Sequence, residues 1–447
     1  MKYFKCLVAF SVALFSQSFA FAQNPWSLEQ CVKYALDHNI NIQQQQLQAE
    51  QSANTLFQSK FNFLPSVNAN VSYRVGWGTT ETRVVKDSTT TNVFIDNTSQ
   101  SITPSIYASI NLFEGLRKIH TLNKNKADYN AAQQEVENLR NNISIEVARA
   151  YLQVLLSKEV LATAKKSLES VEEQLAITRK LVEAGSQPYS NQLEIEAQLA
   201  SEQVQLITAQ NQVEVSYLTL CQWIGVHRSS AFEIETPSID IAIVPASESV
   251  DNLYDLAQRL PQIQIVEYRK ESAKHAHSIA KSRFWPTLSF SASYGSGAYY
   301  SSALPSVNFW DQINQNVDYG FSFGLNIPIF QNWNIVTGAK NAKLNYKIAA
   351  LEVERRHDLL YKEIQQVVLE ASAAYNKYKA GDRNVTATEE SFRYTQQKFE
   401  IGSATSTDYN VAKNNLFKAQ SNMLQAKYQY VFQLKILDFY KGNPFTL

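Results

Sequence analysis

The sequence predicts an α+β membrane protein in which one structural unit, helix–strand–strand–helix–helix, occurs twice along the chain. Three observations support this fold class. Two long segments carry a seven-residue repeat of apolar positions, four short segments alternate apolar and polar residues, and both patterns recur at matched spacings. A seven-residue period is typical of coiled-coil helices, and a two-residue period is typical of strands with two unlike faces.

The seven-residue repeats are the longest regular features of the chain. Core positions of the first repeat form two seams three residues apart: Val147, Val154, Leu161, Leu168, Leu175 and Val182, beside Ala150, Ser157, Ala164, Val171 and Thr178. The second repeat lies 217 residues later: Ile364, Ala371, Tyr378, Val385, Phe392 and Phe399, beside Val367, Ala374, Gly381, Thr388 and Thr395. Each repeat ends at a glycine, Gly185 or Gly402, and glycine commonly ends helices.

Helices account for most of the predicted structure. In the first half we expect them over about residues 26–62, 114–183 and 190–223. The second half repeats this order, with one helix over about 249–283, a long helix ending near Ile401 and a returning helix from about Thr407. At 1.5 Å per residue the helix at 114–183 would be roughly 105 Å long, which excludes a compact globule. Each long helix should run beside two shorter helices stacked end to end.

Four segments are predicted to be strands, at about residues 66–77, 102–112, 287–295 and 317–327. Residues 78–101 and the segment between the last two strands are predicted to be loops. A tilted strand of roughly 9–11 residues is long enough to cross a bilayer. One face of each strand is apolar and the other carries Ser, Asn, Gly and Asp, which suits lipid outside and water inside. An ordinary half-buried antiparallel sheet alternates in the same way. The candidate lipid-facing residues are Val71, Tyr73, Phe290, Tyr294, Phe321 and Phe323.

Matched spacings define the domain organisation. Phe113 and Gly185 are 72 positions apart, as are Phe330 and Gly402, and a further 40 positions lead to Gly225 and Gly442. Repeats at matched spacing are stronger evidence than any single motif. We therefore expect a first repeat at 23–225, a connector at 226–249, a second repeat at 250–442 and a C-terminal tail at 443–447.

Residues 1–22 resemble a secretory signal peptide. Lys2 and Lys5 precede an apolar run from Leu7 to Phe15, and Ala20-Phe21-Ala22 forms a small-x-small cleavage site. The apolar run is too short to span a membrane, so an uncleaved anchor is the less favoured alternative. Only Cys31 and Cys221 follow the cleavage site, and they are expected to be ordinary buried thiols rather than a disulfide.

Composition and motifs exclude several classes of function. The chain has 41 basic and 41 acidic residues, so its charge gives no reason to expect nucleic acid as a partner. We find no phosphate-binding glycine loop with a lysine, no nucleophile elbow and no paired-cysteine metal site. His275 and His277 are two residues apart on a predicted helix, so they should face different directions as surface residues. We expect neither an enzyme nor a cofactor.

The number of strands predicts an oligomer. Four strands cannot close a barrel, and open strand edges in lipid leave backbone groups unpaired at a cost of several kcal/mol each. Three copies of the chain would supply twelve strands, the smallest natural solution, and the heptad helices of the three copies would wall a tube beside the barrel.

The layout resembles the outer membrane factor family, the TolC-like outer membrane efflux proteins of Gram-negative bacteria. Several motifs carry the resemblance beside the duplicated element order: Phe63-Leu64-Pro65-Ser66-Val67, Phe284-Trp285-Pro286-Thr287-Leu288, Leu112-Phe113-Glu114-Gly115, Val182-Glu183-Ala184-Gly185-Ser186 and Phe399-Glu400-Ile401-Gly402-Ser403. The resemblance implies a homotrimer with a 12-stranded β-barrel in outer-membrane lipid and a long helical coiled-coil tunnel in the periplasm. It also implies a periplasmic adaptor (membrane fusion) protein and an inner-membrane transporter of the RND or ABC type as partners.

The same resemblance implies the roles of the tip residues. Adaptor docking would involve the exposed turns: Ala184, Gly185, Ser186, Ile401, Gly402 and Ser403. In the family, acidic residues six and nine positions after the second tip glycine narrow the tunnel. Here Asp408 and Val411 occupy those positions, and Asn191 stands where an Asp is common after the first tip glycine. Asp408 could instead be an ordinary helix N-terminal carboxylate favoured by the helix dipole.

Two other classes of protein share parts of this pattern. A trimeric coiled-coil structural protein or adhesin with a β-barrel anchor would carry its strands at one end of the chain. A soluble exported coiled-coil scaffold would pack one face of its strands against protein. The export channel is preferred because strand pairs are inserted symmetrically in both halves.

Overall fold

A computed structural model describes residues 25–86, 89–227, 232–237, 249–302 and 307–443. It divides into two compact units. The helical unit contains residues 1–46, 135–263 and 356–447, and the strand unit contains residues 47–134 and 264–355. The predicted signal peptide at 1–22, most of the connector and all of the tail except Asn443 lie outside the described residues.

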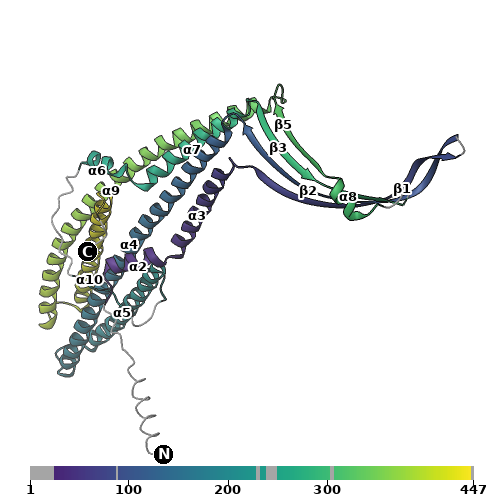
Figure 1. Ribbon diagram of the computed structural model, residues 1–447. Coiled ribbons are helices and arrows are strands. Elements are labelled where there is room, and N and C mark those ends of the chain that lie inside the picture. Colours follow the sequence, from purple (N-terminus) through teal and green to yellow (C-terminus); the bar gives the residue numbers. More distant parts are fainter. Residues whose placement is uncertain (1–24, 87–88, 228–231, 238–248, 303–306, 444–447) are drawn as a thin grey trace, which may run out of the picture. The chain divides into compact units, whose positions relative to one another are not determined.

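Helices dominate both halves of the chain (Figure 1). The two long helices are α4 (Arg117–Glu183) and α9 (Asn334–Glu400), each 67 residues and therefore about 100 Å long. The returning helices are α5 (Tyr189–Ile224) and α10 (Ser406–Tyr440). The predicted order and the duplication are confirmed, because each half carries helix, strands, long helix and returning helix in sequence.

The leading helix of each half is interrupted, although the sequence predicted one continuous helix there. In the first half α2 (Leu28–His38) and α3 (Ile40–Phe61) meet at Asn39, which has extended backbone geometry. The Asn39 amide donates to the Trp223 carbonyl at 3.1 Å and accepts from the Asn41 N–H at 2.9 Å. In the second half α6 (Val250–Ala257) and α7 (Pro261–Ser282) are separated before a proline, which disfavours helical geometry in the preceding residue.

The core of the helical unit is largely apolar where α2, α4 and α5 meet. Buried residues there include Cys31, Val147, Tyr151 and Leu220. The Tyr151 hydroxyl donates to the carbonyl oxygens of Trp26, at 3.2 Å, and Glu235, at 2.8 Å. These contacts tie the start of the first repeat and the described part of the connector to the centre of α4. A second apolar cluster joins α6, α7, α9 and α10.

The strand unit contains one antiparallel sheet in the order β1-β2-β3-β5. Its strands are β1 (Ser66–Lys86), β2 (Thr89–Phe113), β3 (Thr287–Gly295) and β5 (Asp318–Asn326), and the short β4 (Ala298–Ser301) also pairs with β2. A short helix, α8 (Phe309–Gln315), lies between β4 and β5 in the chain. β4 and α8 occupy a segment that the sequence predicted to be a loop.

The loop predicted at residues 78–101 is wrong. Strands β1 and β2 continue through it, paired from Gly78 and Asn97 to Lys86 and Thr89, and only residues 87–88 lie outside the described residues. The hairpin runs well past the ends of β3 and β5 (Figure 1). The segment is rich in threonine, which is polar and so resembles a loop, but its branched Cβ favours strands.

Candidate functional site

The two predicted tips are exposed turns with the same geometry. Gly185 has a φ of 71° and Gly402 a φ of 74°, which an L-residue adopts only with strain. Each turn makes the paired hydrogen bonds of a Schellman motif. Ser186 N–H donates to the Leu181 carbonyl at 2.9 Å, and Ser403 N–H donates to the Lys398 carbonyl at 2.7 Å. A Cβ at either glycine would have nothing within 4 Å, so backbone conformation alone requires glycine there.

The side chains around these turns are accessible. Ala184, Ser186, Ile401 and Ser403 are all exposed, and Ile401 keeps 80 % of its surface. Because the Ile401 side chain stays exposed, folding of the single chain buries little of its apolar surface. The predicted docking positions therefore lie where another protein could reach them.

The hairpin of α4 and α5 packs directly against the hairpin of α9 and α10 near the tips. A small apolar cluster there joins Val171, Ile195, Phe399 and Tyr409. Two polar contacts add to it: the Gln187 amide donates to the Phe399 carbonyl at 3.5 Å, and the Ser406 hydroxyl donates to the Glu194 carboxylate. Any movement of one tip away from the other must break these contacts.

Asp408 occupies the first turn of α10, where it forms a capping box with Thr405. Its carboxylate accepts from the Thr405 N–H at 3.1 Å and from the Thr405 hydroxyl at 2.7 Å, and its own N–H donates to that hydroxyl oxygen at 3.1 Å. The Thr405 hydroxyl lowers the pKa of Asp408, with help from the backbone bond. Asp408 is therefore an exposed, ionised helix cap, and a cap and a channel charge are compatible roles.

Asn191 and Val411 are the other two residues at positions that, by the family resemblance, would narrow the tunnel. Asn191 lies in the first turn of α5, and its amide donates to the Gln187 side-chain oxygen at 3.5 Å. Val411 is 55 % exposed. Neither residue carries a charge, so Asp408 is the only one of the three candidates that could attract cations.

A buried polar layer lies between the hairpins near the tips, and its residues were not predicted from the sequence. Lys413 of α10 is 4 % exposed, and its ammonium group donates to the Ser167 carbonyl of α4 at 2.6 Å. Glu202 of α5 is 1 % exposed and accepts from the Gln198 amide at 2.8 Å. Burial lowers the pKa of Lys413 to about 8, although the Glu202 charge acts in the opposite direction.

Polar atoms near this layer are incompletely satisfied. Among the described atoms, Gln174 Nε2, Thr178 Oγ1 and one carboxylate oxygen of Glu202 have no hydrogen-bond partner. Buried polar groups without partners cost about 1–3 kcal/mol each. The tip of the bundle is therefore packed less favourably than the apolar core around Tyr151.

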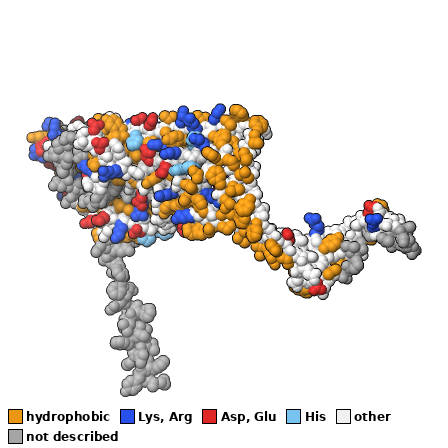
Figure 2. Space-filling view, turned by 45° about the horizontal axis from the view of Figure 1, so that its top comes forward, with side chains coloured by type: hydrophobic (Ala, Val, Ile, Leu, Met, Phe, Trp, Pro, Cys, Tyr) orange, Lys and Arg blue, Asp and Glu red, His pale blue; other side chains and the backbone are white. Residues whose placement is uncertain are grey.

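The predicted lipid-facing residues lie on one face of the sheet. The register pairs Val71 with Pro104, Tyr294 with Ile106 and Phe290 with Phe323, which places their side chains on a common side. Phe321 and Phe323 are 75 % and 70 % exposed. The opposite face carries polar and small residues: Asn68, Asn70, Ser72, Ser105, Ser109, Ser289, Ser291, Ser322, Gly320 and Gly324. Figure 2 shows hydrophobic side chains gathered where the strands join the helices.

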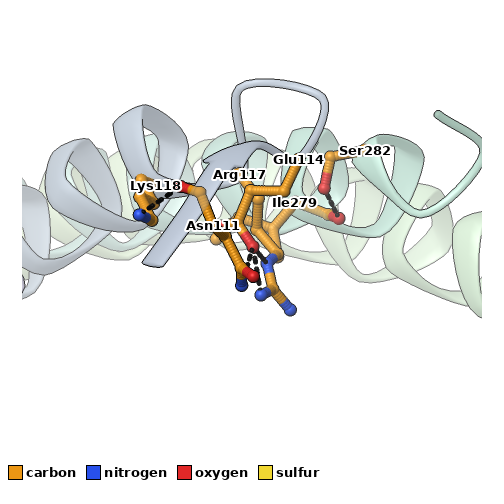
Figure 3. A network of polar contacts seen from close by, with 6 residues as sticks. All are labelled: Asn111, Glu114, Arg117, Lys118, Ile279 and Ser282. Carbon is orange, nitrogen blue, oxygen red and sulfur yellow. Dashed lines mark hydrogen bonds and ion pairs between the residues drawn. The ribbon is translucent and has the colours of Figure 1, made fainter. Parts of the chain in front are cut away.

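A polar network holds the junction between β2 and α4 (Figure 3). Glu114 is buried and accepts hydrogen bonds from the Asn111 amide at 3.3 Å and from Arg117 Nε at 3.0 Å. Lys118 donates to the Asn111 carbonyl at 2.7 Å. Gly115 has a φ of 62°, and a Cβ there would lie 2.8 Å from the Ser282 carbonyl oxygen. The Leu112-Phe113-Glu114-Gly115 motif thus fixes the direction in which the chain leaves the strand.

Histidine and cysteine positions give no sign of catalysis or metal binding. His275 is mostly buried, which corrects the prediction of a surface residue, because its ring packs 5.7 Å from that of His120 on α4. Cys31 and Cys221 are both buried and do not form a disulfide, as predicted. Within the described ranges, no group of three or more His, Cys, Asp or Glu side chains could hold a metal ion. No helix in the same ranges is long and apolar enough to cross a membrane.

Comparison with known proteins now identifies the family. The model of the family "Outer membrane efflux protein" matches residues 31–226 and 252–443, one match for each half of the chain. The chain belongs to the outer membrane efflux protein family. Membership confirms the predicted family, the duplicated fold, the outer-membrane location in Gram-negative bacteria and the expectation that the chain is not an enzyme, because the family consists of channels.

Individual proteins similar to this chain are distant from it in sequence, and the solved structures among them share its fold. The outer membrane protein TolC of Vibrio cholerae is 22 % identical over 297 residues, which are 66 % of each chain. The crystal structure of CusC has a TM-score of 0.78 at 15 % identity, covering 95 % of this chain and 96 % of that one. The CmeC channel of Campylobacter jejuni has a TM-score of 0.77 at 17 % identity, with 94 % and 86 % covered. The alignments to TolC and to the efflux protein TtgC of Pseudomonas putida span only 66 % and 59 % of those relatives.

Proposed function

We propose that three copies of this chain form a passive export channel through the outer membrane. The observation that carries the proposal is the sheet with two unlike faces and two open edges. Among the described strands, β1 and β5 have no partner on their outer sides. Unpaired strand edges cannot lie in lipid, so β5 of one copy must pair with β1 of the next. Three copies would close a barrel with the polar face inside.

Exposed apolar side chains on the helices support association of several copies. Val204, Ile207, Val215 and Leu218 of α5 are each at least 44 % exposed in the single chain. Leu344, Ile348 and Leu351 of α9 are at least 54 % exposed. A row of apolar residues at helical spacing needs a partner to cover it. Neighbouring copies would supply that partner and complete a helical tunnel.

The domain division expected from the sequence serves this assembly. We propose that residues 23–225 and 250–442 act as equivalent wall segments, each bringing one pair of strands and one helical hairpin, with residues 226–249 as connector and 443–447 as tail. The adhesin alternative is disfavoured, because strands occur in both halves rather than at one end of the chain.

Partners would meet the channel at its exposed tips. We propose that the turns at Ala184–Ser186 and Ile401–Ser403 receive a periplasmic adaptor protein, which links the channel to an inner-membrane transporter of the RND or ABC type. Opening would move residues near 175–195 and 392–412 outward. Three copies of Asp408 would form a ring that attracts cations at the tunnel entrance, as rings of acidic side chains do in other channels.

The first test combines mass and conductance. Protein extracted in detergent should have the mass of a trimer and should produce single-channel currents of low, fluctuating amplitude in planar bilayers. Protein that is released without detergent, or that never inserts, would overturn the channel and leave a helical scaffold.

The lipid-facing assignment has a matched pair of variants on one strand. Phe321→Lys would place a charge on the apolar face and should weaken insertion by about 2–4 kcal/mol if that position lies at mid-bilayer. Ser322→Lys, on the polar face of the same strand, should insert normally. Insertion is measured by heat-resistant trimer in isolated membranes. Equal insertion of both variants would show that the Phe321 face does not meet lipid.

A further inference from the structure

A pocket of about 230 Å³ lies at the outer end of the apolar sheet face. Tyr73, Ile102 and Ala298 lie side by side on that face across three strands, and Gln100 with Tyr300 follows two residues further out. Val307, Phe309 and Gln312, in and just before α8, complete the wall. Of the described residues that line the pocket, none is charged, so it does not suit a phosphate or a metal ion.

The pocket is preformed because hydrogen bonds fix α8 against the strands. Gln312 Oε1 accepts from the Tyr299 N–H at 2.8 Å, and Gln312 Nε2 donates to the Val307 carbonyl at 3.1 Å. The Asn316 amide donates to the Gly297 carbonyl at 2.8 Å, and the Ser296 hydroxyl donates to the Ile313 carbonyl. On the other wall, the Tyr73 hydroxyl donates to Gln100 Oε1 at 3.1 Å. The hollow therefore exists before any ligand arrives.

The pocket also marks a step in the sheet. Strands β3 and β5 reach only Gly295 and Asp318 at this end, whereas β1 and β2 continue for more than ten further residue pairs. Ala298 is the smallest side chain on the pocket floor, and it leaves the hollow open. If lipid covers Val71, Phe321 and the rest of the apolar face, as proposed above, it would continue directly into this step.

We propose that the pocket holds one acyl chain of an outer-leaflet membrane lipid. The proposal rests on the proposed function, because it requires the apolar face to meet lipid. Most of the lining is aliphatic or aromatic, with Gln100, Ser101 and Gln312 as its polar members, and this uncharged surface suits the chain. The tyrosine hydroxyls and the Gln100 amide suit the polar boundary above it, where tyrosine is enriched in membrane proteins. The bound lipid would fill the step between the long and the short strands and support the base of the projecting hairpin.

Photolabelling of the intact protein tests the site. The protein is reconstituted into phosphatidylcholine vesicles that contain a phosphatidylcholine with a diazirine on one acyl chain, and the labelled peptides are mapped. Labelling per exposed residue should be concentrated on the segment containing Tyr300 and Phe309, above that on Phe321 and Phe323. Ala298→Trp fills the hollow and should lower this labelling by roughly tenfold.

Ala292→Trp provides the matched control, since Ala292 lies on the same apolar face opposite Phe321 and does not line the pocket. It should leave the labelling near Phe309 unchanged. Even labelling along the whole apolar face of the wild-type protein would overturn the lipid site and leave the channel intact, a result that does not depend on whether Ala298→Trp folds. Absence of labelling at Phe321 and Val71 would overturn the membrane face itself.

Discussion

The helical unit is held together by two packing centres of different composition. Around Tyr151, helices α2, α4 and α5, together with Tyr428 and Val431 of α10, bury an almost entirely apolar set that includes Cys31 and Leu220. Near the tips, Lys413 of α10 and Glu202 of α5 are buried, and the apolar cluster that joins the hairpins there is small. Apolar burial stabilises with every group removed from water, whereas polar burial stabilises only when each atom finds a partner. The difference teaches that the same pair of hairpins is fixed at one level and is easier to separate at the other.

The largest effect is expected in the apolar centre. Leu220 is fully buried, so Leu220→Ala should lower the free energy of unfolding by about 2–5 kcal/mol through lost burial and an unfilled cavity. Leu220→Met keeps the volume and should cost less than about 1.5 kcal/mol. Thermal unfolding of the detergent-extracted protein measures both. Equal losses in the two variants would contradict tight packing in this centre.

The tip centre should respond to pH through Lys413. Its pKa in the packed tip is lowered to about 8 from an ordinary value of 10.5. Between these values the separated tip binds more protons than the packed tip, so raising the pH stabilises packing, by up to about 3 kcal/mol. Burial raises the pKa of Tyr409 to about 12, so that neighbouring group stays neutral throughout the range.

If the packed tip is the closed state of the channel, the pH dependence of tip packing can be measured as a change in conductance. Conductance of the wild-type channel should fall between pH 8 and pH 10, and Lys413→Met should remove the dependence. A rise in conductance over this range would mean that Lys413 is not buried in the closed channel. A dependence that survives Lys413→Met would assign the titration to another group.

Removing an unpartnered polar atom should stabilise the packed tip. Thr178 is fully buried, and its hydroxyl has no hydrogen-bond partner among the described atoms, so Thr178→Val should stabilise packing by about 1 kcal/mol. Thr163 lies on the same helix, and its hydroxyl donates to the Glu159 carbonyl at 3.0 Å. Thr163→Val should therefore bring no gain. Open probability in planar bilayers compares the two, and an identical response would show that the Thr178 hydroxyl is satisfied in the assembled channel.

Periodicity was sufficient to predict the elements that carry one dominant pattern. The heptads located α4 and α9, and alternation located β3 and β5 almost to the residue. Local exceptions defeated it. Asn39 interrupts a helix because its side chain bonds to Trp223, which is distant in sequence. The threonines between 78 and 101 are compatible with a strand as well as with a loop.

The candidate site divides in the same way. The glycines of the tips were predictable because a left-handed turn leaves a sequence signal at Gly185 and Gly402. Lys413 and Glu202 were not, since a single charged residue in a polar helix resembles a surface position. The burial of Lys413 depends on which face of α10 meets α4, and tertiary packing rather than local sequence determines that face.

The smallest effect is expected at Asp408, where two variants separate a role as a helix cap from a role as a channel charge. Asp408→Asn removes the charge but keeps an oxygen that can accept from the Thr405 N–H, so it should lower cation selectivity with little loss of stability. Thr405→Ala keeps the charge and removes the cap, which should cost about 0.5–2 kcal/mol of local helix stability. Reversal potentials in a salt gradient measure selectivity. If both variants leave the reversal potential unchanged, Asp408 is only a helix cap; if Asp408→Asn alone shifts it, the three carboxylates face the path of the ions.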